Sequence, residues 1–480
     1  MNQNKPWEKF YSPAAFGFDA DNLPFENLVD LIRKSQDRFG SRCAVSTVLP
    51  DGASTTVTYA ELNAYSDDFA AFLREVLQLG ARDVVGIMTA NCIGFSVAAF
   101  GTFKANCICT NINPLYTPPE LEHQLNDSGA RVLVVLDAFS EKVDAVIERT
   151  GVEHVVKLSL VDFFPVETPR PTAPAMQTAH TPMAAALFAG SRSRDDDSVA
   201  AYTISLEKDD TAVYQYTGGT TGPSKGAELT HRGILANAYM EQAMYSELLD
   251  NDAAETVLIA LPLYHITAFT LLQVFGLGIG AHLLMAPSPR PVSNLKTAFE
   301  GYEVSWFIGI NTLFAALINE PWFKRETFSS LKFCASGGAA QHVAVAEQWQ
   351  QGTGVEVLEG YGMTEVCGVI SITPAAHCRL GFAGVPVPGF EVKIMDKGGE
   401  ESPVGTPGEL WVRSPTVMKG YLHRPEATAE AIVAGGWLRS GDLATIDADG
   451  FLKIVDRLKD MILVSGFNVF PTEVECRFAH

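Results

Sequence analysis

Positive charge is scarce in this sequence. Its 480 residues include 35 lysines and arginines against 56 aspartates and glutamates, which gives a formal net charge of −21 at pH 7. A surplus of negative charge on this scale repels nucleic acid and anionic membrane surfaces. We therefore expect no nucleic-acid partner, and an anionic substrate must be drawn in by local hydrogen-bond donors.

Long apolar runs and paired cysteines are also missing. A membrane-spanning helix needs about 18 consecutive apolar residues, and no stretch of the sequence is that long. Residues Met1 to Trp7 lack the apolar core of a signal peptide. The eight cysteines are scattered, without a Cys-x-x-Cys or Cys/His spacing that suggests zinc. These absences predict buried thiols in a reducing cytoplasm, although a fatty substrate could bring the protein to a membrane surface.

The composition that remains is that of an α/β protein with a large core, with 47% hydrophobic and 19% charged residues. Val84 to Met88 and Arg131 to Leu136 read as short buried strands, separated by an apolar helix around Phe95 to Phe103. Because strand and helix alternate, the fold class is predicted to be α/β with parallel-type sheets. The length exceeds what one compact core holds, so we expect several subdomains.

Two changes of composition suggest where the subdomains divide. A stretch rich in Pro, Thr and Ala between Pro165 and Pro182 predicts a crossing between two lobes, and short Gly- and Pro-rich strands follow Ala383. We expect a large multi-lobed N-terminal domain over residues 1–456, with two α/β sheets in lobes 1–180 and 200–382 and a small β lobe at 383–456. Residues 457–480 are expected to hold a hinge and the start of a small C-terminal α/β domain.

One loop combines glycines, hydroxyl groups and a lysine between two apolar segments, from Tyr214 to Ala227. Its glycines can adopt backbone angles that aim N–H groups at one point, and its hydroxyls and lysine add further donors to an anion. The residues concerned are Thr217, Gly218, Gly219, Thr220, Thr221, Gly222, Ser224 and Lys225. A Walker A loop is excluded, because it needs a glycine before the lysine and a hydroxyl after it, where Ser224 and Gly226 stand here. A flexible surface loop is the alternative.

This loop resembles the phosphate-binding loop of the adenylate-forming superfamily, which includes acyl-CoA synthetases, firefly luciferase and peptide-synthetase adenylation domains. Gly218-Gly219 replaces the commoner Ser-Gly, and Pro223 lies one place earlier than the usual proline. The Gly-Gly form looks most like bacterial long-chain fatty acid CoA ligases. Asn111 to Glu122 is similar to a segment of fatty acyl-CoA synthetases, although its residues alone favour a proline-capped helix start.

The resemblance implies roles for four further groups of residues. Gly337, Gly338 and Ala339 would form a wall for adenine, and Tyr361 would stack on this base beside Gly362. Thr364 would contact the α-phosphate and Glu365 would hold magnesium, whereas the residues alone also fit a turn before a helix with Thr364 as its cap. Asp442 would bind the ribose with Arg457 as its partner. Lys225, Thr364 and Glu365 are the expected catalytic residues.

The acyl group is expected in an apolar tunnel. Its predicted walls are the segment from Phe307 to Phe314, with Gly309 and Asn311, together with His265, Gly337, Gly338 and Gly362. His265 is expected to be a wall of this tunnel without a proton-transfer role. No Ser/His/Asp nucleophile arrangement is evident, and in the family the substrate carboxylate itself attacks ATP.

The function implied is that of a long-chain fatty acid CoA ligase that uses ATP, Mg²⁺ and coenzyme A. Lys459 resembles the family's hinge, and the family's late catalytic lysine has no counterpart before His480, so we expect poor acyl-CoA formation by this chain. Other readings are a nucleotide- or acyl-binding protein without turnover, a ligase for another carboxylic acid, and an oxidative relative. Homodimers occur among the relatives, so a homodimer is also considered.

Overall fold

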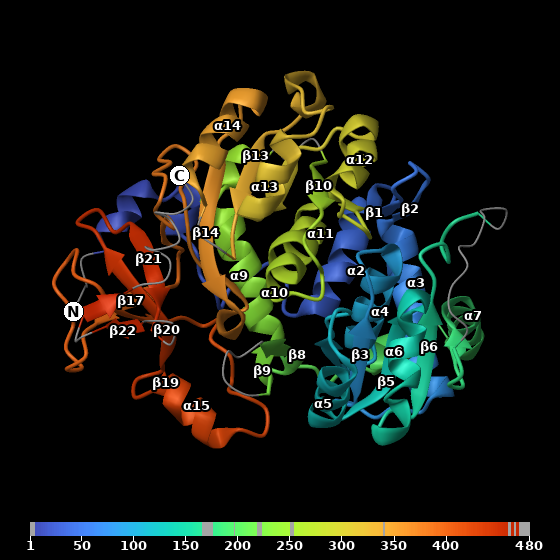
Figure 1. Ribbon diagram of the computed structural model, residues 1–480. Helices are drawn as coiled ribbons and strands as arrows, with labels where there is room; N and C mark the ends of the chain where they lie inside the picture. Colours follow the sequence, from blue (N-terminus) through green and yellow to red (C-terminus); the bar gives the residue numbers. More distant parts are fainter. Residues whose placement is uncertain are drawn as a thin grey trace.

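The computed structural model describes residues 5–165, 176–195, 197–217, 223–249, 254–338, 341–458, 462–464 and 467–469. Figure 1 shows a mixed α/β molecule, with the first sheet at the lower right, a second sheet at the upper centre and a smaller sheet at the left. The helices are α1 (Pro13–Phe16), α2 (Leu28–Phe39), α3 (Tyr59–Ala71), α4 (Ile93–Lys104), α5 (Pro118–Ser128), α6 (Ser140–Asp144), α7 (Met183–Ser193), α8 (Ser198–Ala201), α9 (His231–Met244), α10 (Ile266–Ala268), α11 (Phe275–Ile279), α12 (Lys296–Gly301), α13 (Asn311–Ile318), α14 (Val343–Thr353) and α15 (Pro425–Ala431).

The first sheet has seven strands and is parallel except at one edge. Its order is β7 (Thr181–Pro182), β6 (His154–Leu158), β5 (Ala130–Leu136), β3 (Val84–Met88), β4 (Ile108–Asn111), β8 (Thr211–Thr217) and β9 (Lys225–Thr230). β8 and β9 form an antiparallel hairpin. The phosphate-binding loop predicted from the sequence therefore connects the two strands of an edge hairpin.

The second sheet has nine strands, and its central strands are parallel. Its order is β16 (Val385–Pro386), β15 (Gly368–Ile372), β14 (Val357–Met363), β13 (Phe333–Ser336), β12 (Trp306–Gly309), β10 (Thr256–Ile259), β11 (His282–Met285), β1 (Cys43–Val48) and β2 (Ser54–Thr58). The strands from β14 to β1 pair in parallel, and both edges end in antiparallel pairs.

The sheets do not follow the expected division of the chain near residues 180–200. Strands β1 and β2 come from the first 60 residues but belong to the second sheet, whereas β8 and β9 follow residue 200 but belong to the first. Strand neighbours are selected by backbone pairing and shared burial, which need not follow sequence order. The lobe boundaries at 180 and 200 therefore do not separate the two sheets.

The third sheet is antiparallel and confirms the predicted small β lobe. It orders β17 (Glu391–Met395), β18 (Gly408–Arg413), β20 (Trp437–Ile446) and β19 (Ile432–Val433), and β21 (Leu452–Arg457) also pairs with β20. A separate hairpin joins β22 (Ile462–Val464) to β23 (Phe467–Val469).

Two helices fill the space between the two large sheets. α4 contacts β1 of the second sheet and β3 and β4 of the first, while α9 contacts β9 and β15. Every residue of α4 is buried, as expected for a helix that is apolar on all sides. Buried thiols are found at Cys92, Cys107, Cys109, Cys334 and Cys367. Within the described residues, no helix combines the length and apolar character needed to cross a membrane.

Candidate active site

The phosphate hairpin, residues 211–230, carries Lys225 in the last strand pair before its connecting loop. Thr217 and Lys225 are partners in the pairing of β8 with β9, so both flank the turn. The turn residues Gly218, Gly219, Thr220, Thr221 and Gly222 lie outside the described residues. Ser224, directly before Lys225, is held through its carbonyl oxygen, which lies 2.9 Å from His123 Nε2.

Lys225 and Glu365 both contact Tyr421, Lys225 at its ring and Glu365 at its hydroxyl. The sequence reasoning did not identify Tyr421. The Lys225 ammonium lies 4.5 Å from the centroid of the Tyr421 ring, within the range of a cation–π contact. The Tyr421 hydroxyl donates a hydrogen bond of 2.7 Å to Glu365 Oε1. Burial and the Glu365 charge raise the pKa of Tyr421, so its hydroxyl remains a donor at neutral pH.

Backbone pairing explains how Tyr421 reaches this position. The Glu228 amide donates to the Gly420 carbonyl at 2.9 Å, and the Leu422 amide donates to the Gly226 carbonyl at 2.8 Å. The segment of residues 419–422 thus runs beside β9, and Ala227 forms an antiparallel bridge with Tyr421. A tyrosine after a glycine has no sequence signal that distinguishes this pairing from an ordinary loop.

Tyr361 and Asp442 also meet, although they belong to different sheets. The Tyr361 hydroxyl donates to Asp442 Oδ2 at 2.5 Å, and Arg457 Nε lies 3.4 Å from Asp442 Oδ1. Burial, and then the charge of Asp442, raise the pKa of Tyr361 well above its ordinary value. Asp442 and Arg457 face each other in the pairing of β20 with β21. Three residues that the resemblance grouped around one nucleoside are therefore in contact.

The predicted glycines have different structural requirements. A Cβ atom at Gly337 would lie 3.4 Å from the Gly360 carbonyl, which is ordinary contact, and Gly338 has open space but a φ of +80°. A Cβ atom at Gly362 would lie 1.9 Å from the Gly368 carbonyl oxygen. The side-chain direction of Gly362 thus faces the backbone of β15, and only its exposed backbone remains to face a ligand. Ala339 and Lys459 lie outside the described residues.

Glu365 fits the role of a magnesium-binding carboxylate. It is buried in the 3₁₀ turn η9 (Thr364–Val366), with one oxygen bound by Tyr421 and the second without a described hydrogen-bond donor. No group of three or more His, Cys, Asp or Glu that could hold a metal occurs in the described ranges. Mg²⁺ commonly takes only one or two carboxylates and completes its shell with water and substrate phosphates. Thr364 is half-buried beside Glu365, and no described residue bonds its hydroxyl.

The residues predicted to line the acyl tunnel have several different environments. His265 directly precedes α10 without a side-chain capping bond and is exposed, although the surrounding protein desolvates its imidazole and lowers its pKa. Gly309 ends β12 against the Phe314 ring, and the Asn311 side chain accepts a hydrogen bond from the His342 amide at 3.0 Å. Asn311 therefore supports the neighbouring loop.

Phe307 and Phe314 are not on an open tunnel. Both side chains have no solvent exposure, and both pack against the Trp349 ring. Alternate residues of a strand point to opposite faces of the sheet. Phe307 points to the face that packs against Phe314 and Trp349. These two rings are therefore core residues, and the role of the segment from Phe307 to Phe314 as a tunnel wall stays a prediction.

Comparisons with known proteins show which family the chain belongs to. Residues 32–422 match the family described as AMP-binding enzyme. A long-chain-fatty-acid–CoA ligase of Escherichia coli O6:H1 is 40% identical over 486 residues, which cover 98% of this chain and 84% of the relative. The solved structure of an anthranilate CoA ligase with anthranoyl-AMP gives a TM-score of 0.83 at 25% identity, over 95% of this chain and 83% of that one.

A solved long-chain-fatty-acid-CoA ligase from Archaeoglobus fulgidus gives a TM-score of 0.76 at 25% identity, over 95% of this chain and 87% of that one. The shared fold and the family match point the same way. The chain belongs to the AMP-binding enzyme family.

Proposed function

We propose that this protein is an AMP-forming long-chain fatty acid CoA ligase. The observation that supports the proposal is that Lys225 and Glu365 both contact Tyr421, because a magnesium-bound triphosphate is stabilised by a cation and a carboxylate held close together. The choice of a long-chain acid is supported by the ligase of Escherichia coli, which is 40% identical over 98% of this chain.

The proposed first step joins the fatty acid to AMP. A carboxylate oxygen of the acid attacks the α-phosphorus of ATP, the bond to the β-phosphate oxygen breaks, and pyrophosphate leaves. Lys225 would stabilise the added negative charge, and the Thr364 hydroxyl would donate to the α-phosphate. Magnesium bound with ATP neutralises phosphate charge, and Glu365 is the residue that would hold it. In the second step the CoA sulfur attacks the acyl carbon, the bond from that carbon to the AMP oxygen breaks, AMP leaves, and the thiol proton is released to solvent.

The nucleoside would be bound by the residues that join the second and third sheets. Asp442 would accept hydrogen bonds from the ribose hydroxyls, with Arg457 holding its carboxylate. The Tyr361 ring would lie against adenine, while its hydroxyl keeps the hydrogen bond to Asp442. Gly337 and Gly338 would form the close backbone wall, since neither carries a side chain that would occupy the space.

This proposal has three finer parts. They are the pivoting of a small domain after Arg457, contact with a membrane surface, and formation of a homodimer. Vesicle sedimentation and sedimentation velocity test the last two. Binding to neutral vesicles that salt does not abolish, and a concentration-dependent dimer, are the expected results.

The test is exchange of labelled pyrophosphate into ATP with palmitate, anthranilate or acetate as the acid. We expect exchange with palmitate to exceed exchange with the other acids by at least about tenfold, which equals about 1.4 kcal/mol of discrimination. Release of acyl-CoA is measured separately. If anthranilate were preferred, the substrate class would be an aromatic acid instead of a fatty acid. Anthranilate is included because the anthranilate CoA ligase superposes with a TM-score of 0.83. Nucleotide binding without exchange would indicate a binding protein.

Replacement of Lys225 by alanine tests the central assignment. Loss of its charge at the phosphate should lower the exchange rate by about 10²- to 10³-fold, the usual effect of removing one donor to the reacting group. Lys419→Ala is the matched control, because Lys419 is an exposed lysine two residues from Tyr421. Equal rates in the two variants would contradict the role of Lys225.

A further inference from the structure

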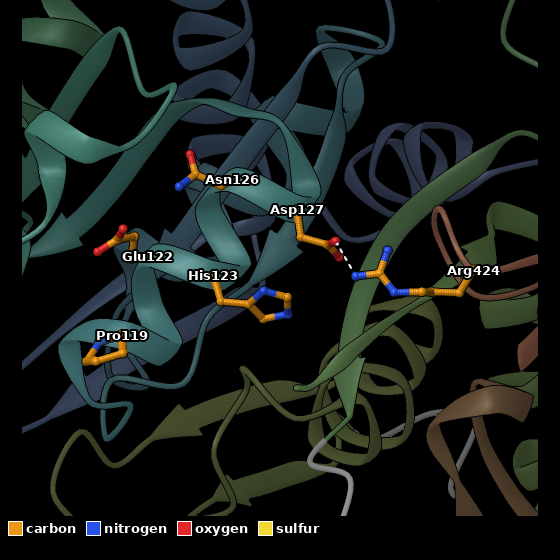
Figure 2. A pocket seen from close by; sticks show the side chains of 6 residues that line it. All are labelled: Pro119, Glu122, His123, Asn126, Asp127 and Arg424. Atoms are coloured by element: carbon orange, nitrogen blue, oxygen red, sulfur yellow. Dashed lines mark hydrogen bonds and ion pairs between the residues drawn. The ribbon is translucent and has the colours of Figure 1, made fainter. Parts of the chain in front are cut away.

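One face of α5 touches the phosphate hairpin from outside the proposed catalytic groups. His123 and Asp127 lie four residues apart on this helix and therefore share a face. Figure 2 shows both side chains with Arg424 opposite Asp127. They line a cavity of about 530 Å³ together with Pro119, Glu122, Asn126 and Arg424. Asp127 and Arg424 are 297 positions apart in the sequence.

Asp127 binds two parts of the structure around Lys225. Its Oδ2 accepts a hydrogen bond of 2.8 Å from the Tyr216 hydroxyl, and its Oδ1 accepts one of 3.0 Å from Arg424 Nη2. Tyr216 belongs to β8, and its ring lies against Gly226, where an added Cβ atom would be 3.0 Å from the ring. Burial and Asp127 raise the pKa of Tyr216, which keeps its hydroxyl a donor.

Arg424 and His123 complete the contacts of α5 with the hairpin. The Arg424 amide donates to the Tyr421 carbonyl at 3.0 Å, so the arginine fastens the segment whose tyrosine ring lies beside Lys225. His123 Nε2 contacts the Ser224 carbonyl, and a carbonyl oxygen only accepts, so this nitrogen donates. The face of α5 thus binds both hairpin strands and the segment that runs beside β9.

We propose that His123 and Asp127 are positioning residues for the phosphate hairpin, which fix Lys225 relative to Glu365 in the binding of magnesium-bound ATP. They act through Ser224, Tyr216 and Arg424. The proposal rests on the proposed function of Lys225, but its mechanical part, the restraint of the hairpin, does not depend on catalysis.

The test replaces Asp127 by asparagine, which keeps the shape and removes the charge that binds Arg424. We expect the KM for ATP to rise about tenfold, the effect of losing a charge-assisted hydrogen bond, while the KM for the fatty acid changes less than about twofold. Asp127→Glu should recover part of the loss. Glu122→Gln is the matched control, because Glu122 lines the same cavity on the same helix but pairs with Arg149 at 2.8 Å.

A second measurement needs no ligand. Hydrogen exchange of the amides in residues 211–230 should be about tenfold faster in Asp127→Asn than in Glu122→Gln, because freed contacts open the hairpin more often. Tyr216→Phe removes one hydroxyl, leaves the pair of Asp127 with Arg424, and should show the same direction. Combining it with Asp127→Asn should be less than additive, since the two residues share a contact.

The outcomes separate the two proposals. Suppose that the wild-type protein shows no pyrophosphate exchange, while hydrogen exchange in the hairpin is faster in Asp127→Asn. This result would refute the proposed function and support the restraint of the hairpin by Asp127. The positioning role would be overturned if the variants Asp127→Asn and Tyr216→Phe had the same KM for ATP and the same hydrogen-exchange rates as the control Glu122→Gln. An equal rise in the KM of both substrates would also overturn it, because that result indicates general loosening.

Discussion

Tyr421 shows how one residue can set the geometry of two charged groups. Its ring contacts the Lys225 ammonium and its hydroxyl binds Glu365, so the distance between cation and carboxylate depends on one rigid aromatic side chain. A flexible lysine alone would lose rotamer freedom when it binds phosphate, and a preplaced lysine loses less. Tyr421 is therefore expected to affect binding of the magnesium-bound nucleotide more than binding of the acid.

Tyr421→Phe removes the hydrogen bond to Glu365 and keeps the ring beside Lys225. We expect the Mg²⁺ concentration for half-maximal pyrophosphate exchange to rise about three- to tenfold, as for loss of one hydrogen bond to a charged group. Tyr421→Leu removes the cation–π contact as well and should also lower the maximal rate. Identical magnesium dependence of the phenylalanine variant and the wild-type protein would contradict the role given to the hydroxyl.

Glu359 makes the stability of the protein depend on pH. Burial raises the pKa of this carboxyl from 4.5 to about 7, against the weaker opposing effect of the Gln341 amide. Below the unfolded value of 4.5 both states are protonated, so the stabilisation is fully present there. It is lost as the pH rises through about 7, because the folded state holds the proton that the unfolded state has released.

We expect this effect to reach at most about 3 kcal/mol between pH 4.5 and pH 7. Urea unfolding at several pH values measures it, and Glu359→Gln should flatten this part of the pH dependence. The exposed Glu356→Gln serves as the control, since its carboxylate is solvated. An unchanged slope in Glu359→Gln would show that another group titrates.

At the scale of elements, the end of β14 combines strand pairing with the site. The sequence reading offered a turn before a helix with Thr364 as its cap, but the strand continues to Met363 and Thr364 is the first residue of the 3₁₀ turn η9. The pairing of β14 with β15 shifts register between Tyr361 and Gly362. Tyr361, whose hydroxyl bonds Asp442, stands at this irregularity, and such irregularities are common beside active sites.

Gly362→Ala should disturb this pairing directly. Its Cβ atom would lie 1.9 Å from the Gly368 carbonyl oxygen, a backbone atom that cannot move without opening the strands. We expect the free energy of unfolding to fall by about 3 kcal/mol or more, as for strained overpacking. Gly301→Ala is the control, because nothing lies within 4 Å of its added Cβ. A melting temperature of Gly362→Ala within the error of the control would contradict this packing.

At the scale of the whole molecule, the proposed site draws residues from all three large sheets. Lys225 comes from the first, Tyr361 from the second and Asp442 from the third. Tyr421 is paired with β9 of the first sheet and bonds Glu365, which follows β14 of the second. A ligand that contacts residues of every sheet is bound only when the sheets are correctly docked. ATP should therefore stabilise their arrangement as well as the individual residues.

Magnesium-bound ATP at one hundred times its dissociation constant should add about 2.7 kcal/mol to the free energy of unfolding. Calorimetry should show one transition that moves to higher temperature. Asp442→Ala should abolish most of this shift, since the proposed ribose contact is lost and the Tyr361 hydroxyl loses its acceptor. Stabilisation of only one of two separate transitions would contradict coupling between the sheets.

The sequence alone determined the fold class and the small β lobe, and the resemblance of its motifs singled out Lys225, Tyr361, Glu365 and Asp442 as proposed site residues. These were predictable because local patterns carry them: strand–helix alternation, a glycine- and hydroxyl-rich turn, and short motifs with a fixed order of residue types. The proline-capped helix start within Asn111 to Glu122 was predictable for the same reason, and α5 begins at Pro118.

Only the tertiary structure decided that β1 and β2 join the second sheet, that Phe307 faces an aromatic core and that Tyr421 and Asp127 adjoin the site. Each of these depends on backbone pairing or contacts between distant segments, such as the 297 positions between Asp127 and Arg424. Local residue pattern does not specify which strand edge or helix face such a segment will meet. Packing and backbone hydrogen bonds make that selection when the sheets dock.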